Sequence, residues 1–126
     1  MYDKALTIEV LSQILTAAGR ITRRFKAVKS PDDFILSDEG QDRLDAICMM
    51  LVAIGESLKK IDKITGNSLL DKYPQVDWKS AKGIRDIISH AYFDLNAEAV
   101  YETCKNDIPV FVETITGIIE DIKGII

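Results

Sequence analysis

The chain has 126 residues, of which 47% are hydrophobic and 29% are charged, and its formal net charge is −4. This size and composition predict one globular domain, residues 1–126, with a core large enough to fold without disulfide or metal crosslinks. The acidic balance, with a pI near 5.0, argues against a protein that coats nucleic acid or a membrane, so any RNA contact must come from a local basic patch.

The first predicted helix runs from about residue 3 to residue 28. Its apolar residues recur every three or four positions, the spacing of one helical stripe: Leu6, Val10, Ile14, Ala17, Ile21 and Phe25. Five cations gather at its end, where they suit the negative end of the helix dipole: Arg20, Arg23, Arg24, Lys26 and Lys29. We interpret this cluster, the most basic of the chain, as a solvated helix face.

The second predicted helix, about residues 38–63, follows a break at Ser30–Asp33, where Pro31 cannot continue a helix. Its stripe is Leu44, Ile47, Leu51, Ile54, Leu58 and Ile61. Gly55 lies inside this helix, where a glycine costs ~1 kcal/mol relative to alanine. A close contact with another helix would offset that cost, so we expect one at Gly55.

Two further helices complete the prediction. After a loop over about residues 66–74, the third helix starts with Asp77 as its N-cap and runs to about residue 93. The fourth begins after Asn96, continues to the C-terminus and is expected to be kinked at Pro109, whose ring displaces a backbone hydrogen bond. Four amphipathic helices without a credible strand predict an all-α, antiparallel four-helix bundle.

The fourth helix is apolar on more than one side near its end, at Ile118, Ile119, Ile122, Ile125 and Ile126. Surplus apolar surface on a small bundle indicates a partner or a second copy. We therefore expect a homodimer.

No segment predicts a membrane span, a signal peptide or a metal site. The first ten residues, MYDKALTIEV, lack a continuous apolar stretch, and no segment approaches the ~20 apolar residues of a transmembrane helix. Cys48 and Cys104 fall in apolar parts of helices, and with one histidine they cannot form a zinc site of the usual spacing. We expect a cytoplasmic protein with buried, reduced thiols and without metal, cofactor or membrane contact.

The third helix separates polar from apolar residues. At about 100° per residue, Arg85, Ser89, Asp86 and His90 fall within an arc of about 140°. The opposite arc holds the apolar residues of this helix: Ala81, Ile84, Ile87, Ile88 and Ala91. His90, the only histidine of the chain, therefore lies on the polar face together with Arg85.

These residue types allow two interpretations. In the functional one, the imidazole of His90 moves a proton to or from a ribose hydroxyl. Arg85 would hold a phosphate and stabilise the charge of the transition state. In the structural one, the face is solvated and Asp86 and His90 form an i,i+4 pair worth a few tenths of a kcal/mol. The chemistry alone favours the structural interpretation.

The sequence from Arg85 to Tyr92 reads arginine, four residues, histidine, one residue, tyrosine. This pattern, late in a short helical chain, resembles the HepT proteins of the HEPN superfamily. Further segments are similar to that family across nearly the whole chain: Asp33-Phe34, residues 54–57, Pro74, Trp78, residues 93–100 and residues 107–109.

The resemblance implies a metal-independent endoribonuclease that serves as a toxin. HepT-like proteins form two-fold dimers in which the arginine and histidine of both copies line a shared cleft, so Arg85 and His90 would be catalytic. Asp86 and Ser89, on the same polar face, would be supporting residues. The family's antitoxin is MntA, a minimal nucleotidyltransferase that transfers AMP to the motif tyrosine, which is Tyr92 here.

One residue departs from the family pattern. Asp86 occupies a position that is often asparagine, and its carboxylate would repel an RNA phosphate and favour the imidazolium form of His90. The alternative is therefore a non-catalytic helical subunit that docks a small nucleotidyltransferase or presents a substrate to it. Glu56 also matches the family, but its role stays open between a surface carboxylate and a functional one.

Overall fold

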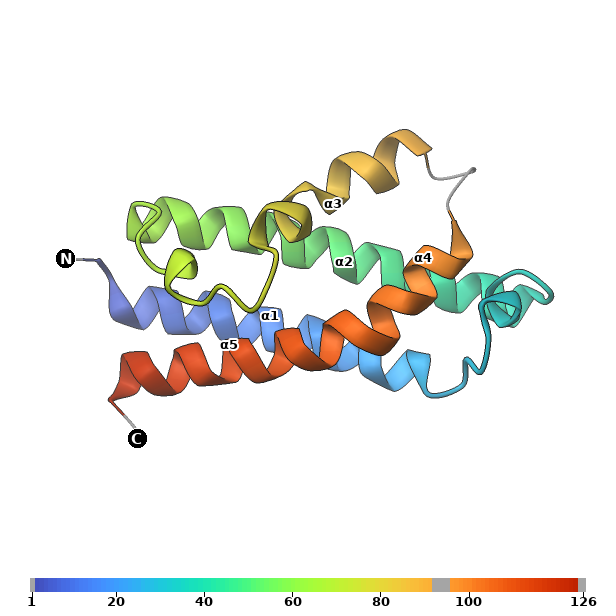
Figure 1. The fold of residues 1–126 in the computed structure, drawn as a ribbon, viewed down its shortest axis with the longest axis horizontal. Helices are drawn as coiled ribbons and strands as arrows, with labels where there is room; N and C mark the ends of the chain where they lie inside the picture. The colour runs from blue at the N-terminus through green and yellow to red at the C-terminus, as the bar shows by residue number, and fades with distance from the viewer. Residues whose placement is uncertain (1, 92–95, 125–126) are drawn as a thin grey trace.

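The computed structural model describes residues 2–91 and 96–124, and over these residues the chain is helical without a strand. Figure 1 shows long helices that lie side by side and a shorter helix that packs against them. Their bounds are α1 Lys4–Phe25, α2 Asp38–Thr65, α3 Trp78–Ala91, α4 Ala97–Glu102 and α5 Ile108–Lys123, with α4 and α5 joined end to end through Thr103–Asp107. This arrangement confirms the predicted all-α helical bundle.

Side-chain caps fix where the helices begin. Asn96 accepts hydrogen bonds from the backbone N–H groups of Glu98 and Ala99, and the Asp77 carboxylate accepts one from Ser80 at 3.1 Å. Both predicted N-caps are therefore confirmed, because each side chain satisfies an N–H that has no partner within its helix. The first helix ends at Phe25, three residues earlier than predicted, and α2 continues to Thr65.

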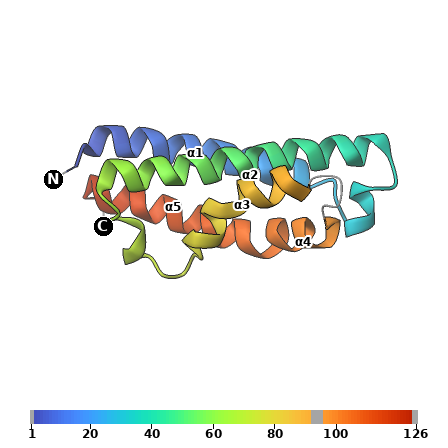
Figure 2. The same cartoon turned by 90° about the horizontal axis from the view of Figure 1, so that it is seen from above.

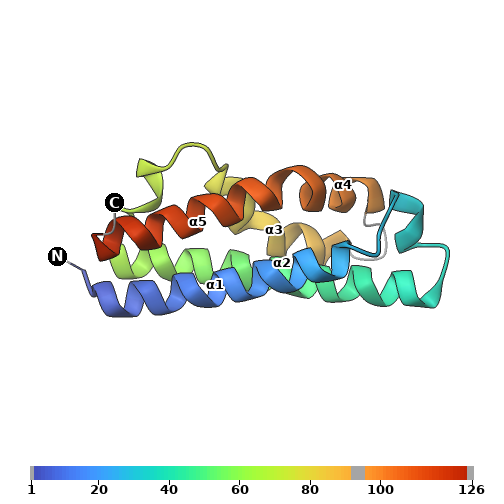
Figure 3. The ribbon, with the colours of Figure 1, turned by 90° about the horizontal axis from the view of Figure 1, so that it is seen from below.

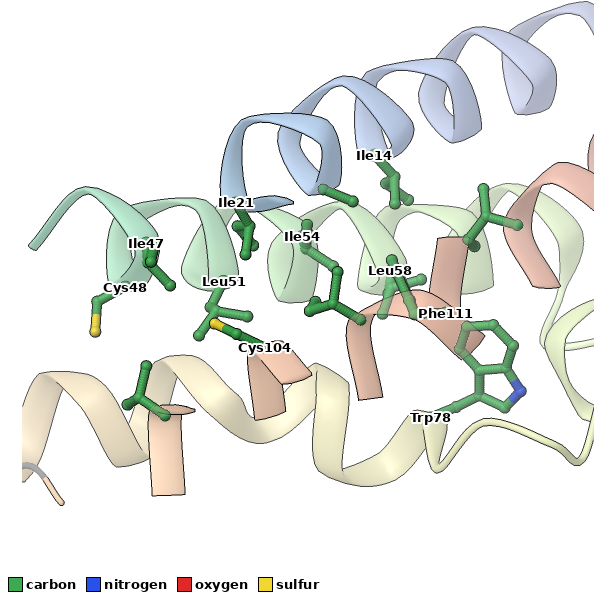
Figure 4. Packing of buried hydrophobic residues seen from close by; sticks show 14 of the residues in the cluster. Ile14, Ile21, Ile47, Cys48, Leu51, Ile54, Leu58, Trp78, Cys104 and Phe111 are labelled. Atoms are coloured by element: carbon green, nitrogen blue, oxygen red, sulfur yellow. The ribbon is translucent and has the colours of Figure 1, made fainter. Parts of the chain in front are cut away.

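The core lies between α1, α2 and α5. Helices α1 and α2 pack along each other, α5 packs against α1, and α3 packs chiefly against α2 (Figures 1 and 2). Figure 4 shows apolar side chains of α1 and α2 converging with Phe111 of α5 and Trp78 of α3. The indole of Trp78 donates to the carbonyl of Tyr73 at 2.8 Å, and its ring lies 6.1 Å from that of Phe111. Trp78 thereby ties the start of α3 to α5.

The end of α5 differs from the prediction. Ile118 is fully buried, and Ile119 and Ile122 are half-buried against the core. These side chains, which were expected to form surplus apolar surface, therefore pack inside the bundle, because α5 lies against α1 along its length (Figure 3). Ile125 and Ile126 lie outside the described residues. Among the residues that the structure describes, the large exposed apolar side chains are instead Leu6, Ile35, Leu36, Met49, Ile87 and Val110.

The fourth helical segment is interrupted just before Pro109. Residues Thr103–Asp107 form a π-helical turn, and Pro109 lies in the first turn of α5. Proline lacks an N–H and its ring clashes with the carbonyl four residues earlier, so a locally wider turn accommodates it. Figure 1 shows the chain changing direction between α4 and α5. The sequence predicted an interruption at Pro109 but not its π-helical form.

None of the described helices is both long enough and apolar enough to cross a membrane.

Both cysteines are buried and unpaired, as predicted. Burial raises the pKa of the Cys48 thiol to about 11, with a further contribution from Asp45. Burial likewise raises the pKa of the Cys104 thiol to about 12, with a smaller contribution from Cys48. Both groups are therefore protonated thiols near neutral pH, which are poor nucleophiles.

We expect both thiols to react slowly with a disulfide reagent in the native protein at pH 8. The reactive species is the thiolate, and its population is small while the pKa values are near 11 and 12. The measurement is the rate of chromophore release, with protein unfolded in guanidinium as the control that should react at once. Two thiols that react equally fast in both states would contradict the burial described here.

Candidate active site

Gly55 sets how closely α3 approaches α2. A Cβ atom at Gly55 would lie 2.9 Å from the carbonyl oxygen of Ala81 and 3.2 Å from Cγ2 of Ile84. Such a distance to backbone is too short for any side chain, so only glycine permits this approach. The predicted close helix contact at Gly55 is confirmed, and its neighbour on α3 is the segment just before the motif.

A partly buried ion pair fixes the orientation of α3 on α2. The Nζ atom of Lys82 donates to Oδ2 of Asp62, and both side chains are largely covered. Ile88 is buried on the core side of α3, and Ile84 is half-buried there. With the rotation of the helix held by these contacts, Arg85 is placed at the α2–α3 seam rather than outward.

Arg85 lies beside Glu56 of α2. Its Nη1 atom is 3.9 Å from Oε1 of Glu56, and Oε2 of the same carboxylate accepts from Lys59 at 3.1 Å. The side chains of Arg85 and Glu56 are 54% and 45% exposed. Pairs this exposed contribute little to stability, roughly 0–1 kcal/mol. The pair therefore leaves the guanidinium at the surface, accessible to an anion.

The rest of the predicted polar face is only partly described. Asp86 and Ser89 are exposed on α3, on the same surface as Arg85. The backbone of His90 lies in the last turn of α3, while its side chain lies outside the part of the chain that the structure describes. Tyr92 also lies outside the described residues. The structure thus places Arg85, Asp86 and Ser89 on the exposed face of α3, and the geometry of His90 and Tyr92 stays a prediction.

One apolar residue of α3 does not lie where the wheel predicted. Ile87 was expected on the buried face with Ile84 and Ile88, but its side chain is 59% exposed. The reason is that α3 packs chiefly against one neighbour, α2, so only a narrow arc centred near Ile88 is covered. Met49 of α2 is 63% exposed and lies two turns before Glu56 on the same side of that helix. Uncovered apolar side chains therefore occur near the candidate site.

Glu56 is the residue whose role the sequence left open. The structure assigns it as the ion-pair neighbour of Arg85. The sequence feature that could have identified this role is the position of Glu56 directly after Gly55, because a residue next to a close helix contact lies at the edge of that contact. Among the described residues, no group of three His, Cys, Asp or Glu side chains gathers as metal ligands do.

A family model described as ribonuclease HepT-like matches residues 14–118, which include the whole Arg85–Tyr92 segment. A candidate RNase of Methanocaldococcus jannaschii is 33% identical over 93 residues, covering 74% of this chain and 71% of that protein. A candidate RNase of Caldanaerobacter subterraneus subsp. tengcongensis is 30% identical over 113 residues, or 90% of this chain and 94% of that protein.

A candidate HepT ribonuclease of Thermococcus cleftensis is 31% identical over 78 residues, and the match covers 62% of this chain and 64% of that protein. Some further curated relatives are likewise matched over less than two thirds of their length, for example 62% of a second candidate RNase of M. jannaschii. No solved structure matches the chain significantly.

Replacing Gly55 by alanine should lower the free energy of unfolding by about 1–3 kcal/mol, the usual cost of overpacking a tight contact. The added methyl group would press on the Ala81 carbonyl and push α3 away from α2. Urea unfolding measures the change. Gly19→Ala is the matched control, because a Cβ there meets nothing within 4 Å; it should leave stability unchanged or raise it by up to ~1 kcal/mol. Equal effects of both variants would show that Gly55 is no contact point.

Proposed function

Because the chain belongs to the HepT-like ribonuclease family, we propose that it is the toxin of a HepT/MntA-type toxin–antitoxin pair. In this proposal the protein is a metal-independent endoribonuclease, and Arg85 and His90 act on RNA in a cleft between two copies. The single observation that carries it is the accessible guanidinium of Arg85 on α3, five residues before His90 in a chain of this family.

The chemistry needs only RNA and the two side chains. His90 accepts the proton of a ribose 2′-hydroxyl while that oxygen attacks the adjacent phosphorus. The bond from phosphorus to the 5′ oxygen breaks, and an imidazolium returns a proton to that leaving oxygen. The products are a 2′,3′-cyclic phosphate and a 5′-hydroxyl. Arg85 stabilises the extra negative charge on the phosphorus-bound oxygens, for which a planar guanidinium is well suited.

A second copy would supply the other half of the cleft. One imidazole serves as base and that of the second copy as acid, which a single histidine per chain requires if both steps are concerted. Met49 and Ile87, both largely exposed, offer apolar surface near the candidate site. Burying them against a second copy would be favourable.

A specific observation favours the alternative as well. Glu56 lies 3.9 Å from Arg85, and Asp86 follows Arg85 on the same exposed helix. Two carboxylates near one guanidinium weaken its attraction for a phosphate. In the alternative, the chain is a non-catalytic helical subunit that docks a minimal nucleotidyltransferase or presents a substrate to it.

Arg85→Ala and His90→Ala should each reduce RNA cleavage by about 100-fold or more, the usual range for a charge-stabilising group or an acid–base catalyst. Cleavage of a labelled RNA in excess EDTA measures both the activity and its independence of metal. Lys79→Ala, which removes another exposed cation of α3, is the control and should retain activity. Asp86→Asn should keep or raise activity because it removes a negative charge near the phosphate.

These variants should keep the helicity and melting temperature of the parent protein. Cleavage that survives in His90→Ala would remove the histidine from the mechanism. Wild-type protein that is dimeric and folded but leaves RNA intact would favour the non-catalytic alternative.

Met49→Glu should convert a dimer into a monomer and abolish cleavage together, because a buried charge at a dimer seam is costly. Sedimentation velocity at micromolar concentration reports the mass. Leu6→Glu, at another exposed apolar residue on α1, should change neither property. A Met49→Glu protein that stays dimeric would place the dimer surface elsewhere.

Tyr92 is proposed as the acceptor of AMP from the antitoxin. Incubation with a MntA-type nucleotidyltransferase, ATP and magnesium should add one or more AMP masses to the chain and stop RNA cleavage without unfolding it. The added phosphate would pair with Arg85 and occupy the space of an RNA phosphate. Intact mass spectrometry is the measurement. A mass increase that persists in Tyr92→Phe would move the acceptor to another residue.

A further inference from the structure

A groove runs along α5 on the side that faces the Tyr73–Asp77 loop and the start of α3. Its first part has a volume of 440 Å³, with an apolar floor that includes Ile54, Ile84 and Phe111. A second hollow of 430 Å³ continues it toward the C-terminus. Both parts are lined by Gln75 and Val110, so the two hollows form one groove. Neither hollow includes Arg85.

Five lining residues, from Asp107 through α5, form one helical stripe, and Ile108, Phe111 and Glu113 line the groove beside it. The lining residues Asp107, Val110, Thr114, Gly117 and Asp121 are spaced alternately by three and four residues, which places them on one face. Val110 is 44% exposed, and a Cβ at Gly117 would meet nothing within 4 Å. At about 1.5 Å per residue the stripe is about 21 Å long. The stripe is uneven, since Val110 is exposed and Thr114 is buried, but its length matches a helix of about four turns.

The rim of the groove is acidic. Asp77, Asp107, Glu113 and Asp121 line it, and none of them forms an ion pair with a cation in the described parts of the chain. Hydrogen bonds from Ser80 lower the pKa of Asp77. The carboxylate of Asp121 accepts a hydrogen bond from the hydroxyl of Tyr73 at 2.6 Å, which holds this carboxylate at the C-terminal end of the groove. The groove therefore combines an apolar floor with negative charge along its length.

We propose that this groove receives an amphipathic helix of a partner protein, apolar along one side and carrying lysine or arginine on its flanks. Apolar residues at helical spacing would fill the floor, and the flanking cations would meet the four carboxylates. Two copies of this chain do not pair groove to groove, because that would bring carboxylates against carboxylates. Arg85 does not line the groove, so the proposal does not depend on whether the chain cleaves RNA.

The test uses the full chain and two labelled peptides of about 15 residues, the length of the stripe. Both carry leucine every three or four residues; the flanks are lysine in one and glutamate in the other. Fluorescence anisotropy should show saturable 1:1 binding of the lysine peptide to each chain, at least tenfold tighter than binding of the glutamate peptide. Equal affinity for both peptides, or no binding of the lysine peptide, would overturn the proposal.

Variants locate the binding. Val110→Arg should lower the affinity for the lysine peptide at least tenfold. Leu6→Arg, at a residue of similar exposure (41%) on α1, should leave that affinity unchanged. Gly117→Leu fills the stripe with a residue that helices accept, and it should also weaken binding at least tenfold. If circular dichroism shows that Val110→Arg does not fold, Gly117→Leu serves as the test of whether the peptide binds in the groove.

Unchanged affinity in Gly117→Leu would show that the peptide binds elsewhere and would refute the groove. Sedimentation provides the remaining check. A wild-type oligomer that Gly117→Leu dissociates would mean that a second copy already fills the groove, which would overturn the assignment to a foreign helix.

Discussion

The close approach of α3 to α2 at Gly55 is the contact on which the described surface depends. A side chain at this position would collide with the backbone of Ala81, so the seam exists only because the residue is glycine. The helical cost of that glycine, ~1 kcal/mol, is offset by the packing that it permits. The contact brings Glu56, the next residue, to the edge of the seam, where Arg85 meets it.

The same seam explains why α3 has two such different flanks. Because α3 packs chiefly on α2, it covers only a narrow arc of its own surface. On one flank, Arg85 and Lys82 reach carboxylates of α2. On the other, the space between the start of α3 and α5 is left as an apolar groove. A helix held equally by several neighbours would have offered neither surface.

Charge has to be considered locally in this acidic chain. The net charge of −4 argues against general nucleic-acid binding, and the rim of the groove along α5 is acidic. Arg85 is exposed but shares its charge with Glu56, which also pairs with Lys59. A second copy would bring its own Glu56 and Asp86 together with its Arg85, so pairing two copies does not raise the ratio of cations to carboxylates at this surface. The arginine of the motif favours phosphate binding, whereas the carboxylates of Glu56 and Asp86 beside it oppose that binding.

The sequence by itself determined the all-α class, the caps at Asp77 and Asn96, the interruption near Pro109 and the tight contact at Gly55. These follow from local chemistry, in which hydrogen bonds to nearby N–H groups and the periodicity of apolar residues act within one helix. The order of Arg85, His90 and Tyr92 likewise indicated the family. Only the tertiary structure decided that Ile87 is exposed, that Ile118 is buried, that Glu56 neighbours Arg85 and that α5 borders a groove. A helical wheel gives the angles between residues of one helix, but the neighbours that cover each angle are set by packing between segments far apart in the chain.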